Sequence, residues 1–392
     1  MEKDHMLIGD SRGLEEVVGK VRDNGSFALD TEFIRERTYR PKLCLVQIAT
    51  AHDAFIVDPL LLGDLTPLAE LLSDPSVEKI VHSGEQDMEI FFRLRREVPH
   101  SIIDTQVAAA FAGYGERISY ARLVEELLGV KLTKGETFTD WSRRPLSEQQ
   151  LAYAADDVRY LYPAAGILRD KLERQGRWTW LLEELEFYAD RASYEEAPEE
   201  IYRRVRTAAK LGSKELAVLR ELAIWREEEA EARDWPRGKI LQDEMLVELA
   251  RRVPSTMESI GAIRGIHPQL VKRCGRQILL RVAKALDLPP DQLPAPLERS
   301  SEDPELSLAL DLLELAVKEK AHEARIAPAY LSTRRDLADL LRCGPGQADS
   351  ASVRVLSGWR RSVVGESLLK ILRGELKVGM ARDGAKVVLK ES

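Results

Sequence analysis

The 392-residue chain is poor in cysteine and in aromatic residues, and it lacks long apolar runs. Its three cysteines, Cys44, Cys274 and Cys343, are far apart, which excludes a disulfide framework and a clustered cysteine metal site. No stretch approaches the roughly 18 apolar residues of a membrane span, so we expect a cytoplasmic protein that is not inserted in a membrane. Instead, the chain is 44% hydrophobic and 32% charged, which suits two or three domains that each bury a core.

The net charge of −8 conceals an uneven distribution along the chain. Residues 1–200 contain 24 lysines and arginines against 38 acidic residues, whereas residues 201–392 contain 34 against 28. An acidic half suits a protein that binds cations, and a basic half suits a polyanionic partner. A solvated surface of either sign would give the same counts, so charge alone assigns no function.

Strand-like and helix-like patterns alternate over the first 190 residues. Short apolar runs predict strands at 26–33, 43–49, 54–57 and 79–82. Helical periodicity follows, ending in one long predicted helix over 147–172, which Ser147 and Gln150 would begin as a capping box. Three consecutive strands, then alternating strands and helices, predict an α/β fold with a mixed sheet.

Beyond residue 183 the patterns become helical. An acidic segment at 194–200 predicts a hinge between domains, and a proline-rich segment at 288–296 predicts a second linker. Turns at Pro236 and Pro328, 92 residues apart, suggest that two helical domains form a diverged repeat. The predicted boundaries are a first domain over 1–190, a linker over 191–211, a helical domain over 212–289, a linker over 290–303, a second helical domain over 304–376 and a tail over 377–392.

Acidic residues at three places in the first domain are candidates for a metal site. Asp30 and Glu32 are two residues apart on a predicted strand, so their carboxylates project from one face and repel each other unless a cation binds them. Asp87 follows the strand at 79–82 and falls in the first turns of a helix. Tyr153 and Asp157 are four residues apart and therefore share one helix face.

Each residue also has an ordinary structural interpretation: a solvated strand end for Asp30 and Glu32, a helix N-terminal acid for Asp87, and a core aromatic and a surface acid for Tyr153 and Asp157. Together, however, the four carboxylates suit two Mg²⁺ or Mn²⁺ ions about 3.5–4 Å apart, an arrangement that hydrolyses phosphodiesters. The tyrosine hydroxyl, with a reference pKa of about 10, would orient the attacking water.

Several stretches resemble motifs of the ribonuclease D family, within the DEDD superfamily of 3′–5′ exonucleases and its tyrosine-containing subgroup. Asp30-Thr31-Glu32-Phe33 resembles the first exonuclease motif, residues 82–87 the second, and residues 153–157 the third. Residues 37–43, 104–106 and 139–146 are also similar, so the resemblance covers most of 26–165 in family order. Asp156 is a departure, because a small residue is expected there; it lies about 100° around the helix from Asp157.

The resemblance implies a ribonuclease-H-like exonuclease domain followed by two HRDC (helicase and RNase D C-terminal) domains, of which the first matches better. It implies release of single 5′-monophosphate nucleotides from RNA 3′ ends, with tRNA precursors as expected substrates. Two alternatives stay open: a DNA 3′–5′ exonuclease of the same superfamily, since no residue unambiguously reads the 2′-hydroxyl, and an RNA-binding protein without catalysis. No obligate protein partner is evident from the sequence.

Basic residues in two segments are candidates for contacts with RNA phosphates. Lys134, Arg143 and Arg144 lie in a polar segment before the long helix, where they would equally well be ordinary exposed cations. Residues 264–284 contain no acid, and we expect RNA affinity at this surface to fall steeply with salt. The candidates within that stretch are Lys272, Arg273 and Arg276.

Overall fold

The computed structural model describes residues 6–132, 139–195, 197–297, 304–347, 353–381, 384 and 386–391. The chain forms two compact units. The first contains Met1–Glu32, Cys44–Arg191 and Glu302–Ser392, and the second contains Phe33–Leu43 and Ala192–Ser301. None of the helices in the described ranges is long and apolar enough to cross a membrane.

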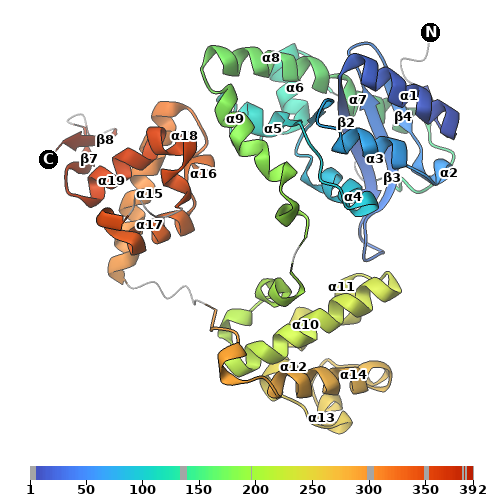
Figure 1. Ribbon diagram of the computed structural model, residues 1–392, viewed down its shortest axis with the longest axis vertical. Helices are drawn as coiled ribbons and strands as arrows, with labels where there is room; N and C mark the ends of the chain where they lie inside the picture. Colours follow the sequence, from blue (N-terminus) through green and yellow to red (C-terminus); the bar gives the residue numbers. More distant parts are fainter. Residues whose placement is uncertain are drawn as a thin grey trace. The chain divides into compact units, whose positions relative to one another are not determined.

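A six-stranded sheet with the order β1-β4-β3-β2-β5-β6 lies in the first unit (Figure 1). Strand β4 pairs in parallel with β1 and antiparallel with β3, whereas β5 pairs in parallel with both β2 and β6. This arrangement confirms the predicted mixed sheet. The strands are β1 (Met6–Ile8), β2 (Ser26–Ile34), β3 (Lys42–Ala49), β4 (Ala54–Val57), β5 (Glu78–Val81) and β6 (Ile102–Asp104).

Helices pack with this sheet in two groups. The first group is α1 (Ser11–Asn24), α3 (Thr66–Ser73) and α4 (Glu85–Arg95), with the short α2 (Pro59–Leu62) directly after β4. The second group is α5 (Thr105–Phe111), α6 (Tyr120–Leu128), α7 (Glu148–Arg159) and α8 (Leu161–Arg174), and α9 (Trp178–Leu185) contacts both α5 and β6.

The single helix predicted over 147–172 is in fact two helices, α7 and α8. The break at Tyr160 has a local cause, because Pro163 in the first turn of α8 has no amide proton to donate to the preceding turn. The capping box that begins α7 is confirmed: the Gln150 amide donates to the Ser147 hydroxyl (3.1 Å), and the Ser147 amide donates to the Gln150 side chain (2.9 Å).

The C-terminal segment folds against α5 and α9 of the first unit. The Trp359 ring stacks on Trp180, with ring centroids 5.3 Å apart, and meets Phe111 edge-on at 5.0 Å. Arg354 and the buried Arg360 both donate to the Glu184 carboxylate. The segment contains α15 (Pro304–Ala324), α16 (Pro328–Leu331), α17 (Arg334–Gln347), α18 (Gly358–Arg360) and α19 (Glu366–Leu372), and an antiparallel pair, β7 (Leu376–Met380) and β8 (Val387–Glu391), where the sequence predicted only a tail.

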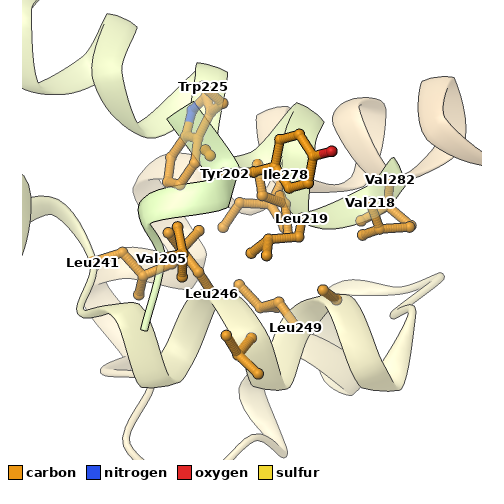
Figure 2. Close-up of a cluster of buried hydrophobic side chains, with 14 of the residues drawn as sticks. Tyr202, Val205, Val218, Leu219, Trp225, Leu241, Leu246, Leu249, Ile278 and Val282 are labelled. Atoms are coloured by element: carbon orange, nitrogen blue, oxygen red, sulfur yellow. The ribbon is translucent and has the colours of Figure 1, made fainter. Parts of the chain in front are cut away.

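The second unit is built from α10 (Ser213–Arg233), α11 (Arg237–Ile240), α12 (Asp243–Arg252), α13 (Met257–Gly261) and α14 (Pro268–Leu286). Helix α10 packs on both α12 and α14, and Figure 2 shows the apolar core that they enclose. Helices α10 and α15 each have 21 residues and each precedes a four-residue helix, α11 or α16, at Pro236 or Pro328. This shared order agrees with the suggested repeat.

Candidate active site

The carboxyl ends of β2, β5 and β6 lie at the same edge of the sheet because these strands run parallel. Ala28 of β2 pairs with Ile80 of β5, so Asp30 and Glu32 lie farther along β2, beyond this pairing. Asp87 follows β5 in the first turn of α4. Strand register thus brings the acids of β2 and α4 to one edge of the sheet.

Helix α7 brings Asp157 to this edge because the next residue, Val158, packs against β2. Val158 is fully buried in a cluster that also contains Ala28, two residues before Asp30. Beyond the effect of burial, the negative charge of Asp157 contributes to the raised pKa of Asp30, and the charge of Glu32 contributes to the raised pKa of Asp157. Residues that are far apart in the sequence therefore share one electrostatic environment.

Burial and mutual repulsion both disfavour the charged forms of these four carboxylates. Burial raises the pKa of Asp30 well above its ordinary value, and the charges of Asp87 and Asp157 raise it further. Burial, then the charges of Asp30 and Asp87, raises the pKa of Glu32 to about 8. Burial also raises the pKa of Asp157 to about 8 and that of Asp87 to about 6, although the Thr31 hydroxyl donates a hydrogen bond to Asp87. Such a cluster favours a bound cation.

The donor set fits a hard divalent cation, because every candidate ligand is a carboxylate oxygen. Within the described ranges, no group of three or more His, Cys, Asp or Glu side chains forms a ready-made metal site. The side chains would therefore have to adjust around a cation, and the positive charge would relieve the repulsion that raises their pKa values.

Asp156 has other partners. Its Oδ1 lies 3.3 Å from Nη1 of Arg159, and its backbone carbonyl accepts a hydrogen bond from the Tyr120 hydroxyl at 2.8 Å. Tyr153 lies one helical turn before Asp157 and packs its ring 6.1 Å from that of Trp141. These contacts favour Asp157 over Asp156 as the acid of α7 that acts with the other carboxylates.

The buried Asp104 organises the turn that carries Asp87, a role that sequence reasoning missed. It accepts hydrogen bonds from the backbone amides of Ser83 (3.0 Å) and Gly84 (3.2 Å) and from the Tyr188 hydroxyl (2.8 Å). Ser83 has a φ of 60°, so this turn needs outside support. The sequence did offer one signal for Asp104, the family-like stretch 104–106. Nothing in that stretch, however, indicates that Asp104 supports the turn before Asp87.

The predicted phosphate-binding residues have different surroundings. Lys134 lies outside the described residues. The Arg144 guanidinium donates to the buried carboxylate of Asp58 and to backbone carbonyls, so the fold already uses its donors. Arg143 is 83% exposed, with Asp140 at 3.7 Å. The other three candidates lie exposed on α14 of the second unit: Lys272, Arg273 and Arg276.

Comparisons with known proteins place the whole chain in one family. Residues 6–175 match the family model described as 3′–5′ exonuclease, and residues 215–282 match that of the HRDC domain. Ribonuclease D of Sphingobium indicum is 39% identical over 379 residues, which cover 95% of each chain. Ribonuclease D of Gluconacetobacter diazotrophicus is 39% identical over 387 residues, 98% of this chain and 96% of that one.

A solved structure agrees with the sequence relatives. The crystal structure of Escherichia coli RNase D, described as an exoribonuclease involved in structured RNA processing, is similar with a TM-score of 0.84 and 33% identity. The similarity covers 95% of this chain and 99% of that one. The resemblance inferred from the motifs is confirmed, and the chain belongs to the ribonuclease D family of 3′–5′ exoribonucleases.

Proposed function

We propose that the protein shortens RNA from its 3′ end with two divalent cations, Mg²⁺ or Mn²⁺, held by Asp30, Glu32, Asp87 and Asp157. The observation that carries this proposal is the convergence of four carboxylates from β2, α4 and α7, none of them exposed, at one edge of the sheet. Burial and mutual repulsion raise the pKa of all four, which supports it. A buried group of like charges destabilises a fold, and perturbed pKa values of this kind cluster at functional sites. The oxygen-only donor set supports hard cations over zinc.

When bound, such a pair of ions activates the attacking water and stabilises the leaving 3′ oxygen. The contribution of the chain itself is to hold the ligands and the water in position. Strand β2 presents Asp30 and Glu32, whereas the N-terminal turn of α4 and the last turn of α7 present the other two acids. Tyr153, on the same face of α7 as Asp157, would orient the water through its hydroxyl.

We further propose that structured RNA precursors, among them tRNA precursors in the cytoplasm, are the natural substrates. Two findings support this: the involvement of the similar Escherichia coli protein in structured RNA processing, and the HRDC match in the second unit. Arg143 near the start of α7, and the exposed basic residues of α14, are the proposed phosphate contacts.

The test is a 3′-end trimming assay with matched single-stranded RNA and DNA and a tRNA precursor, in Mg²⁺, Mn²⁺ or EDTA. We expect ladders of single-nucleotide steps on RNA that disappear in EDTA. Asp30→Asn should reduce the rate about a hundredfold or more, because it weakens cation binding. Asp23→Asn, which changes an exposed acid of α1, is the matched control. Trimming by Asp30→Asn at the control rate would refute the metal site, and preference for DNA would refute the substrate class.

A further inference from the structure

The second unit contains two tryptophans, and its apolar core uses only one of them. Trp225 is 2% exposed, lies in the core drawn in Figure 2, and donates its Nε1 hydrogen to Gln277. Trp235 lies outside that core and is 40% exposed. Trp235 therefore leaves part of its indole surface accessible to a ligand, whereas Trp225 does not.

The backbone around Trp235 is fixed by the end of α10. Asp234 adopts a left-handed conformation with a φ of 48°, and its amide donates to the carbonyl of Glu231 (3.1 Å). The Trp235 amide donates to the carbonyl of Ala230 (2.9 Å), which completes a Schellman motif. Pro236 follows, and α11 begins at the next residue. The indole is therefore presented from a rigid turn.

Two guanidinium groups lie over the indole ring. Arg233, from the last turn of α10, lies 5.9 Å from the ring centroid, and Arg273, from α14, lies 5.7 Å from it. These cation–π contacts join the ring to α14, although α10 and α14 are far apart in the sequence. Flat rings and guanidinium planes are the surfaces on which proteins stack unpaired bases of RNA.

The outer face of α14 continues this surface with positive charge. Its inner face is buried through Leu270, Cys274 and Ile278, so Lys272 and Arg276 project outward together with Arg273. None of these three cations forms an ion pair with a described residue, whereas Arg281 and Lys284, farther along the helix, pair with Glu221. The free charges thus gather on the part of α14 that includes the contact with Trp235.

We propose that Trp235 is a stacking site for one unpaired RNA base, and that Lys272, Arg273 and Arg276 bind the phosphates of the same strand. An aromatic platform beside a cationic track is the general solution for binding single strands without reading their sequence. This inference rests on the proposed function insofar as it takes RNA as the ligand. It adds a place where the second unit holds an unpaired segment of the substrate.

The test measures binding without hydrolysis, with the full-length protein in EDTA and fluorescence anisotropy of two labelled strands. One is oligouridylate of about ten nucleotides, and the other is an abasic ribose-phosphate strand of the same length. Trp235→Ala should weaken oligouridylate binding about tenfold, or about 1.4 kcal/mol. It should leave binding of the abasic strand unchanged, because that strand has no base to stack. Trp235→Phe should restore most of the affinity.

Leu280→Ala is the matched control, since Leu280 is a large apolar residue of α14 that is 70% exposed. It should bind both strands like the unmodified protein. The salt dependence separates stacking from charge: Trp235→Ala should keep the slope of log affinity against log salt, whereas Arg276→Gln should reduce its magnitude by about one. Circular dichroism and the melting temperature report whether each variant is folded.

An equal loss on both strands, or no loss on either, would overturn the stacking site. These outcomes are separable from failure of the proposed function. If RNA trimming depends on Asp30 but oligouridylate binding is unchanged by Trp235→Ala, only the stacking site is rejected. Base-dependent binding through Trp235 in a protein that trims no RNA would reject the metal-dependent hydrolysis and leave the stacking site in place.

Discussion

The most informative substitution outside the carboxylate cluster is Asp104→Asn. Each oxygen of this carboxylate, which is only 2% exposed, accepts two hydrogen bonds. Oδ1 accepts from the amides of Ser83 (3.0 Å) and Gln106 (2.8 Å), and Oδ2 accepts from the amide of Gly84 (3.2 Å) and the hydroxyl of Tyr188 (2.8 Å). An asparagine of the same shape must direct an NH₂ group toward one of these two pairs of donors.

The asparagine amide cannot satisfy all four donors that Asp104 accepts from. Placed at Oδ2, the NH₂ group lets the Tyr188 hydroxyl rotate and accept, but the Gly84 amide loses its acceptor. One buried donor left without a partner costs about 1–3 kcal/mol, and the remaining bonds lose the strength that a charged acceptor provides. We expect the free energy of unfolding to fall by about 3 kcal/mol. Activity should fall at least about tenfold, because the turn at Ser83 and Gly84 positions α4 and hence Asp87.

Guanidinium denaturation of the full chain and the trimming assay measure the two effects. Tyr188→Phe is the comparison, because it removes one hydroxyl and leaves the three backbone donors bonded to Asp104. It should cost about 1 kcal/mol and leave the trimming rate nearly unchanged. If Asp104→Asn matched the unmodified protein in both assays within twofold, the assignment of Asp104 as the support of the turn would be wrong.

Three further predictions concern the same edge of the sheet. Asp157→Asn should slow trimming far more than Asp156→Asn, and the reverse order would identify the wrong acid of α7. Because Glu32 and Asp157 have folded pKa values raised to about 8, the metal-free protein should lose stability as the pH rises from about 4 to 8. The rise in melting temperature caused by Mn²⁺ should therefore be larger at pH 8.5 than at pH 5.5, and an equal rise would contradict the coupling of metal to these protons. Gly84→Ala should destabilise the protein by roughly 1–3 kcal/mol in denaturant titration, because its Cβ would lie 2.6 Å from a methyl group of Val81, and an unchanged midpoint would show that the turn can relax.

The sequence predicted the elements whose own residues carry a complete pattern. Strand β2 has a short apolar run at Phe27–Leu29 that was sufficient to predict a strand over 26–33. Both partners of the α7 capping box lie within four residues, so this helix start could also be predicted locally. Strands β1 and β6 have three residues each, too few for alternation to appear. The break before α8 was readable from Pro163, although the periodicity on either side concealed it.

Partners distant in the chain could not be predicted in the same way. Arg144 looked like a free cation, but its acceptor, Asp58, lies 86 residues earlier and becomes its neighbour only through folding. Asp104 and Tyr188 are 84 residues apart, and the local sequence around each gives no indication of the other as its hydrogen-bond partner. The candidate carboxylates were easier to bring together from the sequence, because Asp30 and Glu32 lie on β2 and the turn before Asp87 directly follows β5. Parallel strands bring such positions to one edge of the sheet.

The packing of Trp359 on Trp180 and Phe111 also has a consequence for biosynthesis. Trp359 is the 179th residue after Trp180, and at roughly 5–20 residues per second the ribosome needs about 10–35 s to reach it. During that interval the residues of the sheet and of α5 and α9 have been synthesised, but the apolar surface around Phe111 and Trp180 is not yet covered by Trp359. The segment that contains Trp359 must therefore be synthesised before this folding unit is complete, and until then a chaperone that shields apolar surface can bind α5 and α9.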